Sequence, residues 1–97
     1  MTSSLQPTPI RAHVFVSGIV QGVGYRFSTV NQANQLGISG WVRNLPDQRV
    51  EAVFEGTPET VTGMISWCKQ GPLGAVVNSV TVEYEEVEGL RGFEIKR

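Results

Sequence analysis

The residues best placed to do chemistry begin in a glycine-rich stretch, GIVQGVGYR, which runs from Gly18 to Arg26. It follows an apolar, alternating segment and precedes a helical pattern, so it predicts a loop that opens a helix. The first backbone N–H groups of a helix have no partners inside it, and glycines let such a loop come close to an anion. Arg26 adds a planar guanidinium that stays charged at physiological pH. The pattern therefore indicates a site for a phosphate-like anion.

The spacing of these residues leaves two interpretations open. The stretch is not a P-loop, because no Lys-Ser or Lys-Thr pair follows the glycines, and it does not match the dinucleotide pattern G-x-G-x-x-G. It either binds a phosphate group or forms a tight strand-to-helix turn in which Arg26 is a solvated surface residue. Glycine content alone does not decide between them.

The composition bounds the class of protein. A chain of 97 residues with 40% hydrophobic residues fits one globular domain, and a net charge of −1 gives no basic field for nucleic acid. The single Cys68 has no disulfide partner and no metal-binding cluster around it, which fits a reducing, cytoplasmic compartment. Residues 1–9 lack the features of a signal peptide, and no apolar run approaches the ~20 residues that span a membrane. We expect a disordered polar tail at 1–9, a monomeric domain at 10–97, and neither metal nor other cofactor.

Alternation and helical periodicity predict the elements that position the loop. Strands are expected at residues 11–17, 40–44, 50–55, 80–84 and 93–95, and helices at 25–36 and 58–70. The apolar stripe of the first helix is expected at Phe27, Val30, Ala33 and Gly37, and that of the second at Val61, Met64, Ile65 and Cys68. The order βαββαβ, with a short final strand, predicts an α+β fold, the ferredoxin-like sandwich. Its two helices should cover one face of a mixed, mostly antiparallel sheet.

Two ordered motifs make the sequence resemble the acylphosphatase family. The first family motif is matched by Val16, Gly18, Val20, Gln21, Gly22, Val23, Tyr25 and Arg26. The second is matched by Gly40, Trp41, Val42, Arg43, Asn44, Val50 and Gly56. The resemblance extends from about residue 12 to residue 96, and two motifs at the right separation are far more specific than either alone.

The resemblance implies hydrolysis of the carboxyl–phosphate anhydride of small-molecule acyl phosphates to a carboxylate and inorganic phosphate, without a metal. At the matching positions, Arg26 would bind the phosphoryl group and Asn44 would orient the attacking water. The backbone N–H groups of the loop would complete the phosphate-binding site at Gln21, Gly22, Val23, Gly24 and Tyr25. A neutral Asn is a poor base, so its role would be positioning. The good carboxylate leaving group fits the lack of a His, Cys or carboxylate pair in the motifs.

Two details of the second motif bear on Asn44. Neighbouring residues of a strand point to opposite faces, so Arg43 and Asn44 should not both face the site, and we favour a surface role for Arg43. Gln48 stands where the family usually has Gly in the turn after Asn44. A left-handed conformation at a non-glycine residue costs about 1–2 kcal/mol. Either the hairpin is slightly strained or its turn type differs.

Two other functions share parts of this pattern. Acylphosphatase-like domains also occur inside larger maturation enzymes, so the chain could be a non-catalytic module that binds phosphate or carbamoyl phosphate. RNA-binding RRM domains share the order βαββαβ, but they need aromatic residues on the third strand. Residues 49–56 hold one aromatic and two acidic residues, which argues against nucleic acid. The presence of both Arg26 and Asn44 favours the enzyme.

Overall fold

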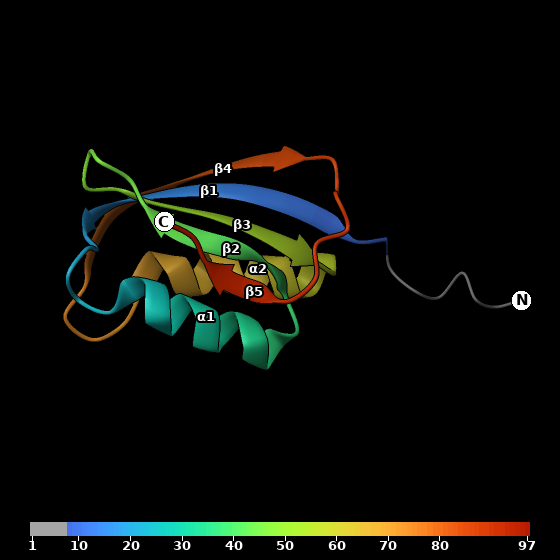
Figure 1. The fold of residues 1–97 in the computed structure, drawn as a ribbon, viewed down its shortest axis with the longest axis horizontal. Helices are drawn as coiled ribbons and strands as arrows, with labels where there is room; N and C mark the ends of the chain where they lie inside the picture. The colour runs from blue at the N-terminus through green and yellow to red at the C-terminus, as the bar shows by residue number, and fades with distance from the viewer. Residues whose placement is uncertain (1–7) are drawn as a thin grey trace, which may run out of the picture.

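Five strands and two helices make up the computed structural model, which describes residues 8–97 (Figure 1). Most of the expected tail, residues 1–7, lies outside the described residues. The elements are β1 Ile10–Ile19, α1 Tyr25–Leu36, β2 Ser39–Asn44, β3 Val50–Gly56, α2 Pro58–Gln70, β4 Val76–Glu85 and β5 Phe93–Ile95. The predicted order and the ferredoxin-like α+β fold are confirmed. None of the described helices is long and apolar enough to cross a membrane.

The strands form one sheet in the order β4-β1-β3-β2-β5, and both helices cover the same face of it (Figure 1). All neighbours are antiparallel except β2 and β5, which run parallel. Two strands extend well beyond their predicted bounds: β1 continues to Ile19 and β4 already begins at Val76. The extension passes through a register shift at Gly18, where φ is 131° and a Cβ would lie 2.1 Å from the Val76 carbonyl oxygen. Only glycine fits this bulge.

The helices differ in how well their buried faces were predicted. In α2, Thr57 caps the first turn by accepting a hydrogen bond from the N–H of Thr60, and the four predicted apolar residues are buried. In α1 the predicted stripe is only partly right: Ala33 is buried and Val30 packs against the core, but Phe27 is 66% exposed. The buried face also holds Tyr25 and Thr29, which were not predicted there. Thr29 tolerates burial because its hydroxyl donates to the carbonyl oxygen of Tyr25 at 2.7 Å.

Buried charges cover the helix-free face of the sheet. Glu55 of β3 accepts a hydrogen bond from Arg11 of β1 at 2.9 Å. It also accepts from the backbone N–H groups of residues 88–90 in the segment that leads to β5. Burial raises the pKa of Glu55, but these hydrogen bonds outweigh it, so the pKa lies below its usual value. The carboxylate thus fixes the path of the chain into β5.

Candidate active site

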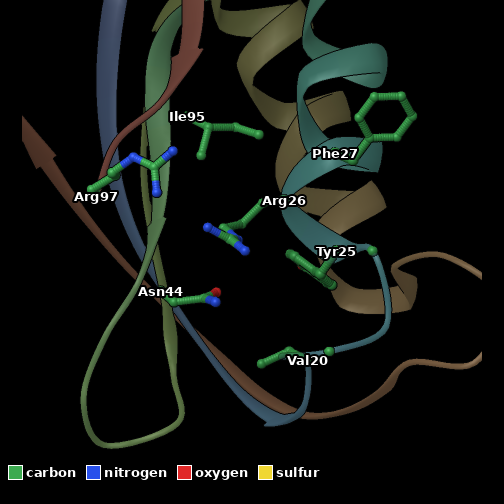
Figure 2. A pocket seen from close by; sticks show the side chains of 9 residues that line it. Val20, Tyr25, Arg26, Phe27, Asn44, Ile95 and Arg97 are labelled. Atoms are coloured by element: carbon green, nitrogen blue, oxygen red, sulfur yellow. The ribbon is translucent and has the colours of Figure 1, made fainter.

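A cavity of about 440 Å³ lies where the loop after β1 meets the end of β2 (Figure 2). Its lining residues are Val20, Gly22, Gly24, Tyr25, Arg26, Phe27, Asn44, Ile95 and Arg97. Five residues singled out in the sequence therefore lie together: two glycines of the loop, Tyr25, Arg26 and Asn44. Arg26 and Asn44, which are 18 residues apart in the chain, both line this cavity.

The loop is shaped by two glycines, Gly22 and Gly24, which both have a φ of 79°. A Cβ at either position would meet no atom within 4 Å, so the left-handed backbone, and not lack of space, favours glycine there. Gly24 precedes α1 and provides no side-chain cap, and no acidic residue lies in the first helical turn. The first N–H groups of α1 therefore remain free to bind an anion.

Arg26 and Asn44 approach the cavity from opposite sides. Figure 2 shows the guanidinium of Arg26 extending from α1 toward β2, and the amide of Asn44 extending from the end of β2 toward α1. Arg97 contributes a second guanidinium, and the nine lining residues include no Asp, Glu, His or Cys. The side chains that line the cavity therefore carry a net positive charge.

The carbonyl oxygen of the Asn44 side chain, Oδ1, is buried and accepts no hydrogen bond from any group in residues 8–97. A buried acceptor without a donor costs about 1–3 kcal/mol. This atom therefore favours a bound molecule that carries a hydrogen-bond donor.

Gln48, in the turn after Asn44, left two possibilities open, a strained hairpin or a different type of turn. Its φ is 78°, so Gln48 adopts the left-handed conformation, and the hairpin is strained rather than rebuilt. The N–H of Gln48 bonds to the Leu45 carbonyl at 3.2 Å, and the N–H of Leu45 bonds to the Arg49 carbonyl at 2.8 Å. Asn44 stays paired with Val50 and remains in register.

Two predicted phosphate-binding residues, Gln21 and Val23, lie outside the cavity lining, as does Arg43. Val23 packs against the hydrophobic core. Gln21 directs its side chain to the hairpin turn, where it donates to the carbonyls of Leu45 and Arg49. Arg43, as predicted, lies on the opposite face of the sheet from Asn44 and pairs with Glu51.

Four lining residues were given no site role in the sequence analysis: Val20, Phe27, Ile95 and Arg97. Phe27 was assigned to the core instead. Ile95 and Arg97 reach the cavity because β5 pairs with β2 in parallel, a long-range pairing that the local pattern does not reveal. Of these four residues, only Val20 lies within the first motif, so it alone could have been assigned to the site from the sequence.

The family model described as Acylphosphatase matches residues 12–95 of this chain. The chain belongs to the acylphosphatase family. An acylphosphatase of a Nostoc species is 66% identical over 95 residues, covering 98% of this chain and 94% of that protein. The chain is thus a hydrolase that acts on small acyl phosphates.

Solved structures agree with this assignment. An acylphosphatase from Coxiella burnetii superposes with a TM-score of 0.88 at 36% identity, covering 91% of this chain and 93% of that one. HypF of Thermococcus kodakarensis contains a similar domain, with a TM-score of 0.80 at 30% identity, but this chain covers only 12% of its length. The fold therefore occurs both as a separate acylphosphatase and within a larger protein.

Tyr25 fixes the start of α1 in this acylphosphatase. Its hydroxyl donates to the carbonyl oxygen of Cys68 at 2.8 Å, and its ring lies 5.5 Å from that of Trp67. Burial raises the pKa of Tyr25, and it raises the pKa of the Cys68 thiol to about 12. Both groups stay protonated, so they support the loop and do not act as nucleophiles.

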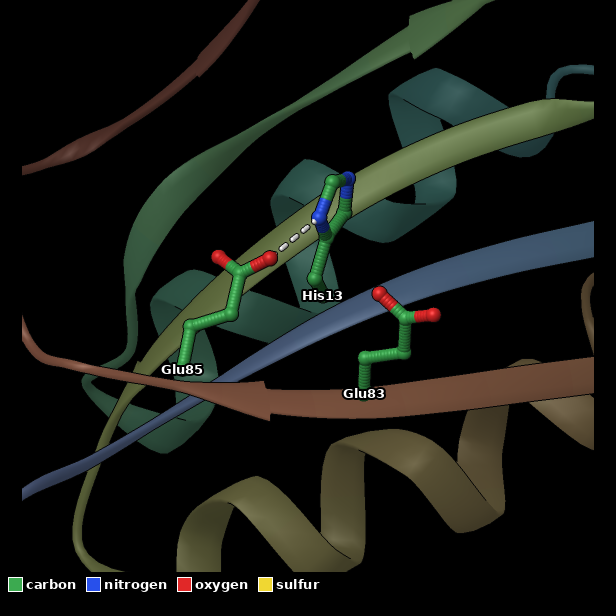
Figure 3. Close-up of side chains that lie close together, drawn as sticks. All are labelled: His13, Glu83 and Glu85. Atoms are coloured by element: carbon green, nitrogen blue, oxygen red, sulfur yellow. Dashed lines mark hydrogen bonds and ion pairs between the residues drawn. The ribbon is translucent and has the colours of Figure 1, made fainter.

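A separate cluster on the helix-free face contains His13, Glu83 and Glu85, whose potential ligand atoms lie within 4.8 Å of one another (Figure 3). His13 Nδ1 lies 2.7 Å from Glu85, and Nε2 lies 2.6 Å from Glu51. Ionised carboxylates only accept hydrogen bonds, so both contacts are satisfied when the imidazole carries both protons. In that form the ring offers no lone pair to a metal, and the cluster is an ion-pair network.

Proposed function

We propose that this acylphosphatase holds the phosphoryl group of its substrate between Arg26 and the backbone N–H groups of residues 21–25, while Asn44 orients the attacking water. One observation carries the proposal. The guanidinium, the first turn of α1 and the Asn44 amide line a single cavity that has no Asp or Glu side chain in its lining.

The phosphoryl half of the cavity suits a loose transition state. In such a state negative charge is spread over the three equatorial oxygens of the transferring group. Arg26 offers a planar fork of donors, and the loop offers backbone N–H groups that the fold fixes before substrate binds. Because these donors are already in place, they need no reorganisation when the charge develops.

Asn44 suits the water half of the cavity. Its buried Oδ1 needs a donor, and a fully ionised phosphoryl group offers none, whereas water offers two. By accepting one water hydrogen, the amide turns an oxygen lone pair toward phosphorus. The new O–P bond forms as the bond between phosphorus and the acyl oxygen breaks. The acyl group leaves as a carboxylate, and the proton of the water ends on the phosphate product.

This scheme needs neither a general acid nor a metal ion. The leaving group is a carboxylate, which is stable without protonation near neutral pH. The negative charge of the phosphoryl group is balanced by Arg26, by Arg97 and by the N-terminus of α1. The scheme therefore accounts for a cavity without His, Cys, Asp or Glu.

The deciding experiment is an assay of the purified chain with benzoyl phosphate, an aryl acyl phosphate, in the presence and absence of EDTA. We expect equal release of benzoate and inorganic phosphate under both conditions. A chain that binds phosphate but does not hydrolyse benzoyl phosphate would instead be a binding module. Loss of turnover in EDTA, with recovery on adding a divalent cation, would contradict the metal-free scheme.

We further expect a cytoplasmic monomer without a nucleic-acid partner. β3 carries the buried residues Glu51 and Glu55 on its helix-free face, where an RNA-binding RRM domain would present aromatic residues. Sedimentation at assay concentrations tests the oligomeric state, and a mass above that of one chain would contradict it.

A further inference from the structure

The side chain of Gln21 joins the phosphate-binding loop to the hairpin that carries Asn44. Its amide nitrogen, Nε2, donates to the carbonyl oxygens of Leu45 and Arg49, each at 2.9 Å. Leu45 directly follows Asn44 in the chain, and its N–H closes the turn by bonding to the Arg49 carbonyl. One side chain thus holds both ends of the turn that follows Asn44.

We propose that Gln21 is a positioning residue for hydrolysis, whose amide sets the spacing between the phosphoryl-binding loop and Asn44. This inference rests on the function proposed above, since it assumes that Asn44 places the water. Gln21 does not touch the reacting atoms through its side chain. It acts by keeping the water in line with the phosphorus atom held by the loop.

The fold provides no other hydrogen bond for this purpose. The ladder between β1 and β3 ends at the pair Val16–Val50, before the loop begins. Within the described part of the chain, the two bonds of Gln21 are the only hydrogen bonds between residues 20–24 and residues 44–49. The loop contains two glycines, whose backbones are intrinsically free, so an external link is needed to fix it.

The chemistry of the link is specific to a primary amide. The nitrogen of a Gln side chain carries two hydrogens, and each is used for one carbonyl. A Glu in its place would set a carboxylate against two carbonyl oxygens, and a Met of similar length would donate nothing. The backbone N–H of Gln21 is unaffected by either substitution, so the loop keeps its donors for phosphate.

Loss of the link should therefore change the chemical step more than phosphate binding. A displacement of 1 Å between reacting groups can lower a rate by about 10²-fold. Arg26 and the loop keep their positions relative to each other when the two hydrogen bonds are lost, so their affinity for phosphate should persist. Asn44 is no longer held relative to the loop, so the water that it binds should lose its alignment with phosphorus.

The test is a double-mutant cycle with Gln21→Met in the wild-type chain and in the Asn44→Ala variant. The measured quantities are kcat on benzoyl phosphate and the inhibition constant of inorganic phosphate. In the wild-type chain we expect kcat to fall about tenfold or more, with phosphate inhibition nearly unchanged. In the Asn44→Ala variant the same substitution should have almost no effect on kcat, because there is no amide left to align. Gln35→Met, at an exposed position of α1, is the matched control and should leave both quantities unchanged.

Several results would overturn the positioning role. These are an unchanged kcat in Gln21→Met, an equal fall of kcat in both backgrounds, and a parallel loss of phosphate affinity. The variant Asn44→Ala separates this failure from that of the proposed function. If Asn44→Ala keeps full kcat, the water-orienting role of Asn44 is wrong, whereas a low kcat there with normal turnover in Gln21→Met contradicts only the role of Gln21.

If Gln21→Met does not fold, Gln21→Glu provides a second test through its pH profile. Protonation of the introduced carboxyl group restores one O–H donor to the turn carbonyls. The kcat of Gln21→Glu relative to wild type should therefore rise as the pH falls through the range of carboxyl titration, near pH 4–5. A ratio that does not change with pH would contradict the proposal.

Discussion

Asn44 and Arg43 are adjacent on β2, yet they lie on opposite faces of the sheet. Asn44 lines the cavity beside α1, whereas Arg43 pairs with Glu51 and lies 5.5 Å from the centre of the Trp41 ring on the helix-free face. Substitutions at these neighbouring positions should therefore have different effects, one on chemistry and the other on stability.

Asn44→Ala should lower kcat by about 10²-fold, because the attacking water loses its fixed position. The inhibition constant of inorganic phosphate should stay close to the wild-type value, since Arg26 and the loop are intact. Arg43→Ala is the matched control. It should keep kcat, and it should lower the free energy of unfolding by less than about 1 kcal/mol, as expected for a partly exposed ion pair. Weakened phosphate binding with normal kcat in Asn44→Ala would show that the assigned role is wrong.

Arg26→Ala should lower kcat/KM by at least about 10²–10³-fold, the loss typical when one donor to the transition state is removed. Phosphate inhibition should weaken in parallel, because the same guanidinium holds the product. Steady-state kinetics with benzoyl phosphate measures both effects. Arg91→Ala, which removes an exposed arginine outside the cavity lining, should behave like wild type. Comparable losses in both variants would point to a general charge effect.

Local sequence pattern predicted most of the fold and part of the site. Each element was found because capping residues and periodicity act over a few residues, as at Thr57 and Pro58. The pairing of β5 with β2, which brings Ile95 to the cavity, depends on contacts about 50 residues apart and leaves no local pattern. Part of the buried face of α1 was missed, because Thr29 is buried through a hydrogen bond to its own helix backbone, while Phe27 is exposed.

The side-chain role of Gln21 was equally hidden in the sequence. The motif indicated its backbone N–H as a donor to phosphate, since neighbouring glycines suggested a loop around an anion. Its amide partners are two carbonyl groups of the turn that begins at Leu45, and backbone carbonyls have no signature in the sequence. Only the three-dimensional approach of the loop to the hairpin reveals the link.

Gln48→Gly should stabilise the hairpin. The left-handed backbone at Gln48 costs about 1–2 kcal/mol relative to glycine. Glycine adds about 0.5–1 kcal/mol of conformational entropy to the unfolded chain, so the two effects partly offset. We expect a net gain of about 0.5–1 kcal/mol in the free energy of unfolding, measured by urea denaturation. The kcat should be unchanged, because Asn44 already keeps its register. A loss of stability would show that the Gln48 side chain makes a favourable contribution that outweighs the backbone strain.

Tyr25→Phe should lower the free energy of unfolding by about 1–3 kcal/mol, because it leaves the buried carbonyl of Cys68 without its donor. Thermal and urea denaturation measure the effect. Tyr84→Phe removes the same hydroxyl at a residue that is 64% exposed, so its effect should stay within about 0.5 kcal/mol. Equal effects of the two substitutions would mean that the hydrogen bond to Cys68 adds nothing to stability.

His13 should make stability fall as the pH rises above about 6.5. Burial lowers the pKa of His13, but its hydrogen bonds to Glu51 and Glu85 outweigh burial and raise the pKa above the ordinary value of 6.5. Glu83 lies in the same cluster and adds negative charge. The carboxylates are shared with cations, since Arg43 also pairs with Glu51, and Arg11 also pairs with Glu85.

A group whose pKa is higher in the folded than in the unfolded chain stabilises the fold fully below its unfolded value. The contribution of His13 should thus be complete below about pH 6.5 and should be lost as the pH rises through the raised folded value. Urea denaturation from pH 5 to pH 9 measures this loss, which should be absent in His13→Gln. His13 is the only histidine of the chain, so its ring signals in an NMR titration report its pKa without ambiguity. A midpoint at or below 6.5 would contradict the doubly bonded imidazolium, because the two carboxylates would then not favour its charged form.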